Sequence, residues 1–127
     1  MKEQSGAFLQ KAGEAMEDAR RSLAADIFRQ AARLSYITAF HCAQAIIFER
    51  TGKAAKTHKG VNAQFARIAK DEAFPQELSH FLASAYHFKA SVDYELGATD
   101  DIKSEDAKDA LRRAQRFLHA VRGILEQ

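Results

Sequence analysis

The segment from Tyr36 to Phe48 constrains the fold more than any other part of the chain. It reads YITAFHCAQAIIF and contains no Asp, Glu, Lys or Arg. A helix that is apolar on every side has to be covered on every side. We therefore predict that this segment forms a helix at the centre of a bundle or at a seam between subunits.

The rest of the chain has the composition of an α-helical protein. It contains one proline and six glycines among 127 residues, and it shows no strand-like alternation of apolar and polar residues. A chain of this length buries about two-thirds of its unfolded surface, so we expect residues 1–127 to form a single domain without disulfides. Short connections between the predicted helices favour an all-α, antiparallel up-and-down bundle of four to five helices.

Five helices are predicted from apolar spacings of three and four and from residues that cap helix ends. They cover about Lys2 to Ala24, Asp26 to Arg50, Thr57 to Asp71, Pro75 to Gly97, and Ser104 to the last residues of the chain. We expect Asp26, Thr57 and Ser104 to be N-caps and Gly52 to be the left-handed residue after the second helix. The short third helix could lie across the long ones.

Charge is distributed unevenly along the chain. The net charge of +2 is too small for a dedicated binder of duplex DNA. However, the stretch from Arg50 to Lys70 contains cations and no acid, whereas five acids lie between Glu95 and Asp106. The cations are Arg50, Lys53, Lys56, Lys59, Arg67 and Lys70. This polarity could steer an anionic ligand to one end of the molecule, and the alternative is ordinary solvated surface.

Targeting signals and cysteine usage favour a cytoplasmic protein. No signal-peptide pattern follows Met1, and the longest apolar run is shorter than the about 20 residues that a membrane span needs. The single cysteine, Cys42, lies in the apolar segment, which is typical of a buried packing residue in a reducing compartment. We expect no membrane association.

Common catalytic and cofactor motifs are absent from the sequence. There is no HExxH, GxxxxGK[ST], GxGxxG or GxSxG pattern. His80 and His87 are two helical turns apart, about 10 Å along the axis, which is too far for one zinc ion. We therefore expect neither a metal nor a cofactor.

A basic turn, Thr57-His-Lys-Gly60, follows the apolar helix. The start of a helix offers unpaired N–H groups, and His58 and Lys59 can add charge-assisted hydrogen bonds to a phosphate. The alternative is that Thr57 only caps the helix while His58 packs against Tyr36 or Phe40.

A second set of polar residues lies in the segment from Tyr86 to Tyr94, on an otherwise apolar helix. Polar groups are costly to bury without partners, so a cleft or a dimer seam is their natural place. The alternative is that Lys89 and Asp93 form an ordinary pair at i and i+4 on a solvated face.

Four segments, in this order, resemble the HEPN-domain family. They are Ser35 to His41, Thr57 to Val61, Ser91 to Tyr94, and the apolar pattern from Asp106 to Leu118. The resemblance implies a helical bundle that forms a two-fold homodimer. It also implies a minimal nucleotidyltransferase as the partner in a toxin–antitoxin-like pair.

The family's active members are metal-independent ribonucleases with an Arg-x(4–6)-His motif, and this chain departs from that motif. Lys89 stands where the arginine is expected, and Tyr94 stands five positions later. Lysine lacks the bidentate fork of arginine, and tyrosine is a poor base at neutral pH. We therefore expect little or no nuclease activity. Arg113 and His119 match the spacing elsewhere in the chain.

The sequence thus predicts a HEPN-type bundle that binds a phosphate-bearing ligand, either a nucleotide or RNA. The expected ligand-binding residues are His58, Lys59, Lys89, Asp93, Tyr94 and His41. Two alternatives remain open. One is an active endoribonuclease toxin that uses Lys89 and Tyr94, Lys89 with His87 or His41, or Arg113 with His119. The other is a purely structural interaction protein without a ligand.

Overall fold

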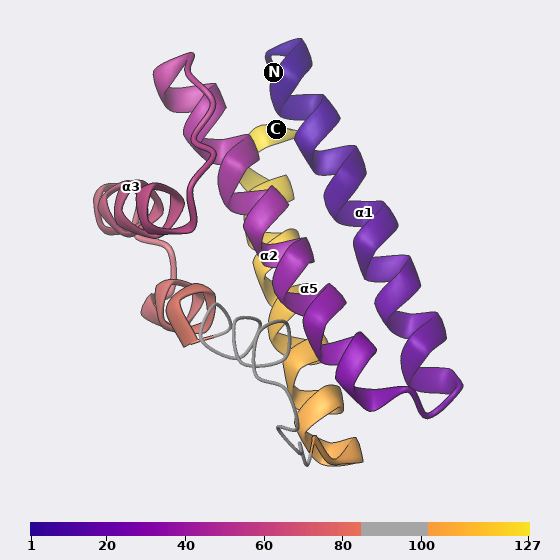
Figure 1. The fold of residues 1–127 in the computed structure, drawn as a ribbon. Coiled ribbons are helices and arrows are strands. Elements are labelled where there is room, and N and C mark those ends of the chain that lie inside the picture. Colours follow the sequence, from indigo (N-terminus) through magenta and orange to yellow (C-terminus); the bar gives the residue numbers. More distant parts are fainter. Residues whose placement is uncertain (85–101) are drawn as a thin grey trace.

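The computed structural model describes residues 1–84 and 102–127 (Figure 1). Its long elements are α1 (Glu3–Ala24), α2 (Phe28–Thr51), α3 (His58–Asp71) and α5 (Ser104–Leu125). Residues 76–84 form a further helical stretch. No residue of the described ranges lies in a strand, which confirms the all-α fold.

The apolar helix α2 is the centre of the fold, as predicted. It packs against α1, α3 and α5. Ile46 and Ile47 are completely buried, as are Ala39, Cys42 and Ala43 around the helix. Each fully buried isoleucine stabilises the folded state by about 1.5 to 3 kcal/mol relative to exposure. The absence of charged residues from Tyr36 to Phe48 therefore follows from the central position of α2.

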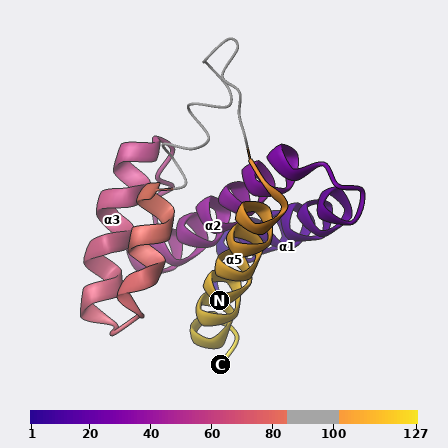
Figure 2. The same cartoon turned by 90° about the horizontal axis from the view of Figure 1, so that it is seen from below.

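The remaining helices are arranged around α2 in two directions. α1 and α2 are antiparallel neighbours, and the chain ends marked N and C lie at the same end of the bundle (Figure 1). α5 therefore runs opposite to α1. α3 lies across the long helices, with the stretch 76–84 beside it (Figure 2). The prediction that the third helix is a cross-piece is confirmed.

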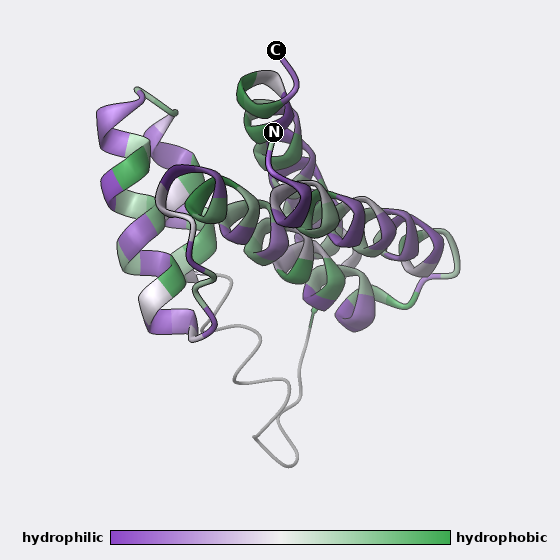
Figure 3. Cartoon of the chain, turned by 90° about the horizontal axis from the view of Figure 1, so that it is seen from above, coloured by the Kyte–Doolittle hydropathy of each residue, from purple (hydrophilic) through white to green (hydrophobic). Residues whose placement is uncertain are grey.

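The outer helices have one buried and one solvated face. On α5, Leu111, Phe117 and Val121 are buried, whereas Arg112 and Arg116 are exposed. Figure 3 shows hydrophilic and hydrophobic residues alternating along α3 and α5, as expected for helices with one face on the core. Within the described residues, no helix is both long enough and apolar enough to cross a membrane.

Asp26 is not the N-cap of α2, so that prediction was wrong. Ile27 occupies the cap position, and Asp26 has a positive φ of 60°. The Asp26 N–H bonds to the Leu23 carbonyl, and the Ile27 N–H bonds to the Ser22 carbonyl. This is a Schellman motif, in which the left-handed position after a helix tolerates Asp and Asn better than most residues. Asp26 therefore ends α1 instead of starting α2.

The predicted start of the last helix was displaced by one residue. Lys103 is the N-cap, and Ser104 is already helical. The Lys103 N–H donates to the Asp106 carboxylate at 3.0 Å. The acid in the first turn thus satisfies the backbone N–H group of the N-cap residue. In contrast, Gly52 has a φ of 74° at the end of α2, as predicted.

The start of α1 is tied to the end of α2. The Lys2 N–H donates to the Glu49 carboxylate at 2.9 Å, and the Lys2 Nζ donates to the Glu49 carbonyl at 2.7 Å. The Glu49 carboxylate thus satisfies an unpaired N–H group at the start of α1, and the Lys2 ammonium group satisfies an unpaired carbonyl at the end of α2. The hydrogen bond from the Lys2 backbone is the main reason that the pKa of Glu49 is lowered.

Arg50 and Glu72 join the ends of α2 and α3 by a bidentate ion pair. The Arg50 Nε and Nη2 atoms lie 2.6 and 2.7 Å from the two carboxylate oxygens of Glu72. The side chains are 39% and 24% exposed, so solvent screens the pair. Hydrogen bonding to Arg50 lowers the pKa of Glu72.

Replacing Glu72 with glutamine is expected to remove a small, pH-dependent part of the stability. Because the folded pKa of Glu72 is lowered, the pair stabilises the protein above the unfolded pKa of about 4.3, and this contribution is lost as the pH falls through the folded value. We expect the variant to lose under about 1 kcal/mol at neutral pH and nothing in strong acid. Urea unfolding at both pH values measures this, and an equal loss at both would contradict it.

Candidate functional site

The elbow between α2 and α3 contains a capped helix start. The Gly60 N–H donates to the Thr57 Oγ1 at 3.0 Å, which confirms Thr57 as the N-cap of α3. A Cβ atom at position 60 would lie 2.8 Å from that oxygen, so glycine permits the close approach. The backbone of α3 therefore presents its positive end beside the exposed Lys59.

His58 lies against aromatic side chains of α2. Its Nδ1 atom is hydrogen-bonded to the Tyr36 hydroxyl, and its ring centroid is 4.8 Å from that of Phe40. Tyr36 is buried, whereas Phe40 and His58 are half-buried. The structure thus shows the packing of His58 on Tyr36 and Phe40 that the sequence left open. Phe40 and His58 thus keep part of their surface exposed to solvent.

His41 lies next to Phe40 in this group, and a hydrogen-bond chain fixes its ring. Its ring centroid is 6.1 Å from that of Phe40. The His41 Nδ1 atom lies 2.8 Å from the Gln44 Oε1 atom, and the Gln44 Nε2 atom donates to the Ala55 carbonyl at 3.0 Å. Gln44 was not predicted as a site residue. Its only sequence signal is a polar side chain within an apolar helix.

Three lysines of the elbow have exposed side chains, whereas the neighbouring Arg50 already forms an ion pair. Lys53, Lys56 and Lys59 are exposed. Arg50 is held by Glu72 and is therefore less suited to bind a phosphate. The basic stretch seen in the sequence thus supplies lysine point charges to the segment that carries His58, whose ring groups with those of Phe40 and His41. We call these three rings and three lysines the elbow cluster.

Four predicted site residues cannot be placed in this geometry. Lys89, Asp93 and Tyr94, together with His87, lie outside the described residues. Their proposed roles stay predictions. Of the predicted ligand-binding residues, His41, His58 and Lys59 are described, and all three belong to the elbow.

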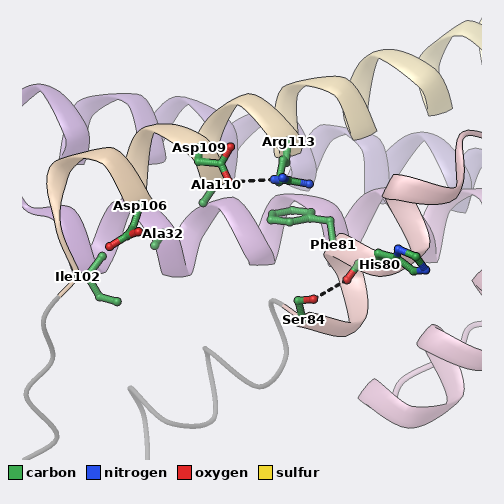
Figure 4. Close-up of a pocket in the computed structure, with 9 residues that line it drawn as sticks. All are labelled: Ala32, His80, Phe81, Ser84, Ile102, Asp106, Asp109, Ala110 and Arg113. Carbon is green, nitrogen blue, oxygen red and sulfur yellow. Dashed lines mark hydrogen bonds and ion pairs between the residues drawn. The ribbon is translucent and has the colours of Figure 1, made fainter.

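A second concave region lies between α2, α5 and the stretch 76–84 (Figure 4). This pocket has a volume of about 430 Å³. It is lined by Ala32, His80, Phe81, Ser84, Ile102, Asp106, Asp109, Ala110 and Arg113. The Arg113 Nε atom lies 2.9 Å from Asp109, and this hydrogen bond lowers the pKa of the Asp109 carboxyl. Much of the charge of Arg113 is therefore compensated within the pocket wall.

Arg113 and His119 have different surroundings on α5. Both lie on α5, where six residues correspond to about 9 Å along the axis and about 120° around it. Arg113 lines the pocket, whereas His119 is exposed on another side of the helix. A joint catalytic role for the two residues stays a prediction.

Cys42 has a structural role only. It is fully buried in α2, and burial raises the pKa of its thiol far above the usual value. The thiolate is the reactive form of cysteine, so Cys42 is not a nucleophile in the folded protein.

The protein is an all-α bundle with a central apolar helix and a basic, aromatic elbow. Comparison with known proteins shows which family of helical bundles it belongs to. The model of the HEPN domain matches residues 5–124. A UPF0332 protein of Thermotoga maritima is 27% identical over 117 residues, which cover 91% of this chain and 86% of that protein. The chain therefore belongs to the HEPN domain family.

Proposed function

We propose that this HEPN protein binds a phosphate-bearing ligand, a nucleotide or RNA, at the elbow cluster. The observation that carries the proposal is the grouping of three half-buried rings, those of Phe40, His41 and His58, beside exposed lysines at the start of α3. Aromatic rings stack on bases, and lysines neutralise phosphates.

Two further properties of the elbow support an anionic ligand. The end of α3 that carries Thr57 is the positive end of the helix dipole, which favours a phosphate nearby. In addition, the stretch from Lys53 to Lys70 contains no acid, so no carboxylate of this segment repels the ligand. In our proposal, Lys59 neutralises a phosphate while the rings contact the base or sugar.

The binding proposal is tested with a fluorescein-labelled single-stranded RNA of mixed sequence. We expect saturable binding, measured by fluorescence anisotropy, that weakens as salt is raised, because phosphate contacts release counterions. The slope of log K against log salt should be about −0.7 for each phosphate contact. Absence of binding to RNA and to mononucleotides would overturn the proposal and favour a purely structural interaction protein.

The same RNA also tests the enzyme alternative. Lys89 and Tyr94 occupy the positions of the family's Arg and His, so we expect the RNA to remain intact after incubation in EDTA. Metal-independent cleavage, seen on a denaturing gel, would establish an endoribonuclease toxin instead. In our proposal, the degenerate motif leaves the protein with little or no nuclease activity.

We also propose that the chain acts as a homodimer paired with a nucleotidyltransferase, in a toxin–antitoxin-like system. The support for the dimer is an uncharged stripe on α2 in which Leu34, Ile37 and Phe48 are half-buried at spacings of three and eleven. Such spacing is typical of a helix–helix seam. Light scattering measures the mass in solution.

The proposal of a nucleotidyltransferase partner rests on membership of the family alone. Co-expression with the product of the adjacent gene tests it.

A further inference from the structure

The hydrogen-bond chain at the elbow determines which nitrogen of His41 carries the proton. The Ala55 carbonyl can only accept a hydrogen bond, so the part of the Gln44 side-chain amide that faces it must be the NH₂ group. The Gln44 Oε1 atom then accepts, and its partner, the His41 Nδ1 atom, must be a donor. The neutral ring of His41 is therefore the Nδ1–H tautomer. A histidine side chain in water favours the opposite tautomer.

This tautomer leaves the Nε2 atom of His41 with a lone pair. Among the described residues, only the Ser5 Oγ and Asn62 Oδ1 atoms are buried side-chain nitrogens or oxygens without a partner. The Nε2 atom has no hydrogen bond to a described residue and is not one of these two, so it is not completely buried. The half-buried ring is thus held by one nitrogen and offers the other outward as an acceptor.

The side chains around this acceptor indicate which group of a ligand it could bind. The ring centroids of His41 and His58 lie 6.1 and 4.8 Å from that of Phe40. The lysines of the elbow cluster are donors only, and they suit a phosphate. His41 supplies what they lack, which is a neutral acceptor for an O–H or N–H group.

We infer that His41 is a specificity-determining residue that accepts a hydrogen bond at Nε2 from a hydroxyl or amino group of the ligand. The inference rests on the proposed function, since it concerns the same ligand. In a nucleotide or RNA, the donors of this kind are the ribose 2′-hydroxyl and the amino groups of the bases. Gln44 is a positioning residue that acts through the ring of His41.

The first test concerns the protein without ligand. Long-range ¹H–¹⁵N correlation spectra distinguish the two tautomers, and the signals of His41 are assigned by their loss in His41→Gln. For the neutral ring, we expect the Nδ1–H form in the wild type. We expect a shift towards the Nε2–H form in Gln44→Met, which removes the amide but keeps the length of the side chain. The Nε2–H form in the wild type would overturn the inference, whatever the protein binds.

The second test compares an RNA and a DNA 10-mer of the same base sequence by fluorescence anisotropy. His41→Ala should weaken binding of the RNA about threefold to tenfold, which corresponds to the loss of one hydrogen bond. His41→Gln should keep most of the affinity, because its amide oxygen can lie near the position of Nε2. Gln10→Ala is the control, since Gln10 is exposed on α1, away from the elbow.

The outcomes separate the inference from the function on which it rests. A loss on RNA alone assigns the hydroxyl as the donor, and an equal loss on RNA and DNA assigns an amino group of a base. RNA binding that His41→Ala leaves unchanged would overturn the role of His41 and leave the binding function intact. Failure of the wild type to bind either oligonucleotide would overturn the binding function and this inference with it.

Discussion

Replacing Phe65 with alanine is expected to lower the free energy of unfolding by about 3 to 5 kcal/mol. Phe65 is completely buried on α3, and its ring centroid lies 4.8 Å from that of Phe117 on α5 and 5.8 Å from that of Phe74. Its removal leaves a cavity where the cross-piece contacts the bundle. The loss is a large part of the about 5 to 15 kcal/mol that stabilise a typical domain.

Urea unfolding followed by circular dichroism measures this effect. Phe65→Leu is the matched variant, because leucine fills most of the volume, and we expect it to lose clearly less than the alanine variant. If Phe65→Ala lost under about 1 kcal/mol, α3 would not pack on the core as described.

Replacing both Lys56 and Lys59 with glutamine is expected to weaken RNA binding about tenfold or more at low salt. Both side chains are exposed at the elbow, and each is expected to neutralise one phosphate. The slope of log K against log salt should become shallower by about 1.4, since each contact with a single strand contributes about 0.7. The loss should be similar for all base sequences, because phosphate contacts carry no sequence information.

The matched control is Lys11→Gln combined with Lys108→Gln. These lysines are exposed on α1 and α5, and this variant removes the same two charges from the net charge of +2. We expect its affinity and salt slope to stay close to those of the wild type. Equal losses in the two double variants would show that binding depends on total charge and not on the elbow.

Much of the fold could be predicted because its causes are local in the sequence. The uncharged run around Cys42 can be satisfied only by burial, and this placed α2 at the centre. Gly52 and Thr57 each have one strong conformational role, so the end of α2 and the start of α3 were predicted correctly. Asp26 has two such roles, N-cap and left-handed C-terminal residue. The hydrogen bonds of the completed turn decide between them, and the sequence does not show these bonds.

The candidate site could be predicted only in part, because its geometry depends on contacts between elements. The sequence indicated His58 and Lys59, which are adjacent in the chain. It could not show that His41 and Gln44 are joined to the backbone at Ala55, since the path of the elbow over α2 sets that contact. The pocket was missed for the same reason. The pair of Asp109 and Arg113 has a recognisable spacing, whereas its position opposite Phe81 follows from packing.

Because Cys42 is buried, the rate at which a thiol reagent labels it can measure the opening of the bundle. The chain contains one cysteine, and none of its surface is exposed to solvent. A thiol reagent added to the intact protein can therefore react only with molecules whose central helix has become accessible. The labelling rate then reports how often the core opens under native conditions, without any engineered probe.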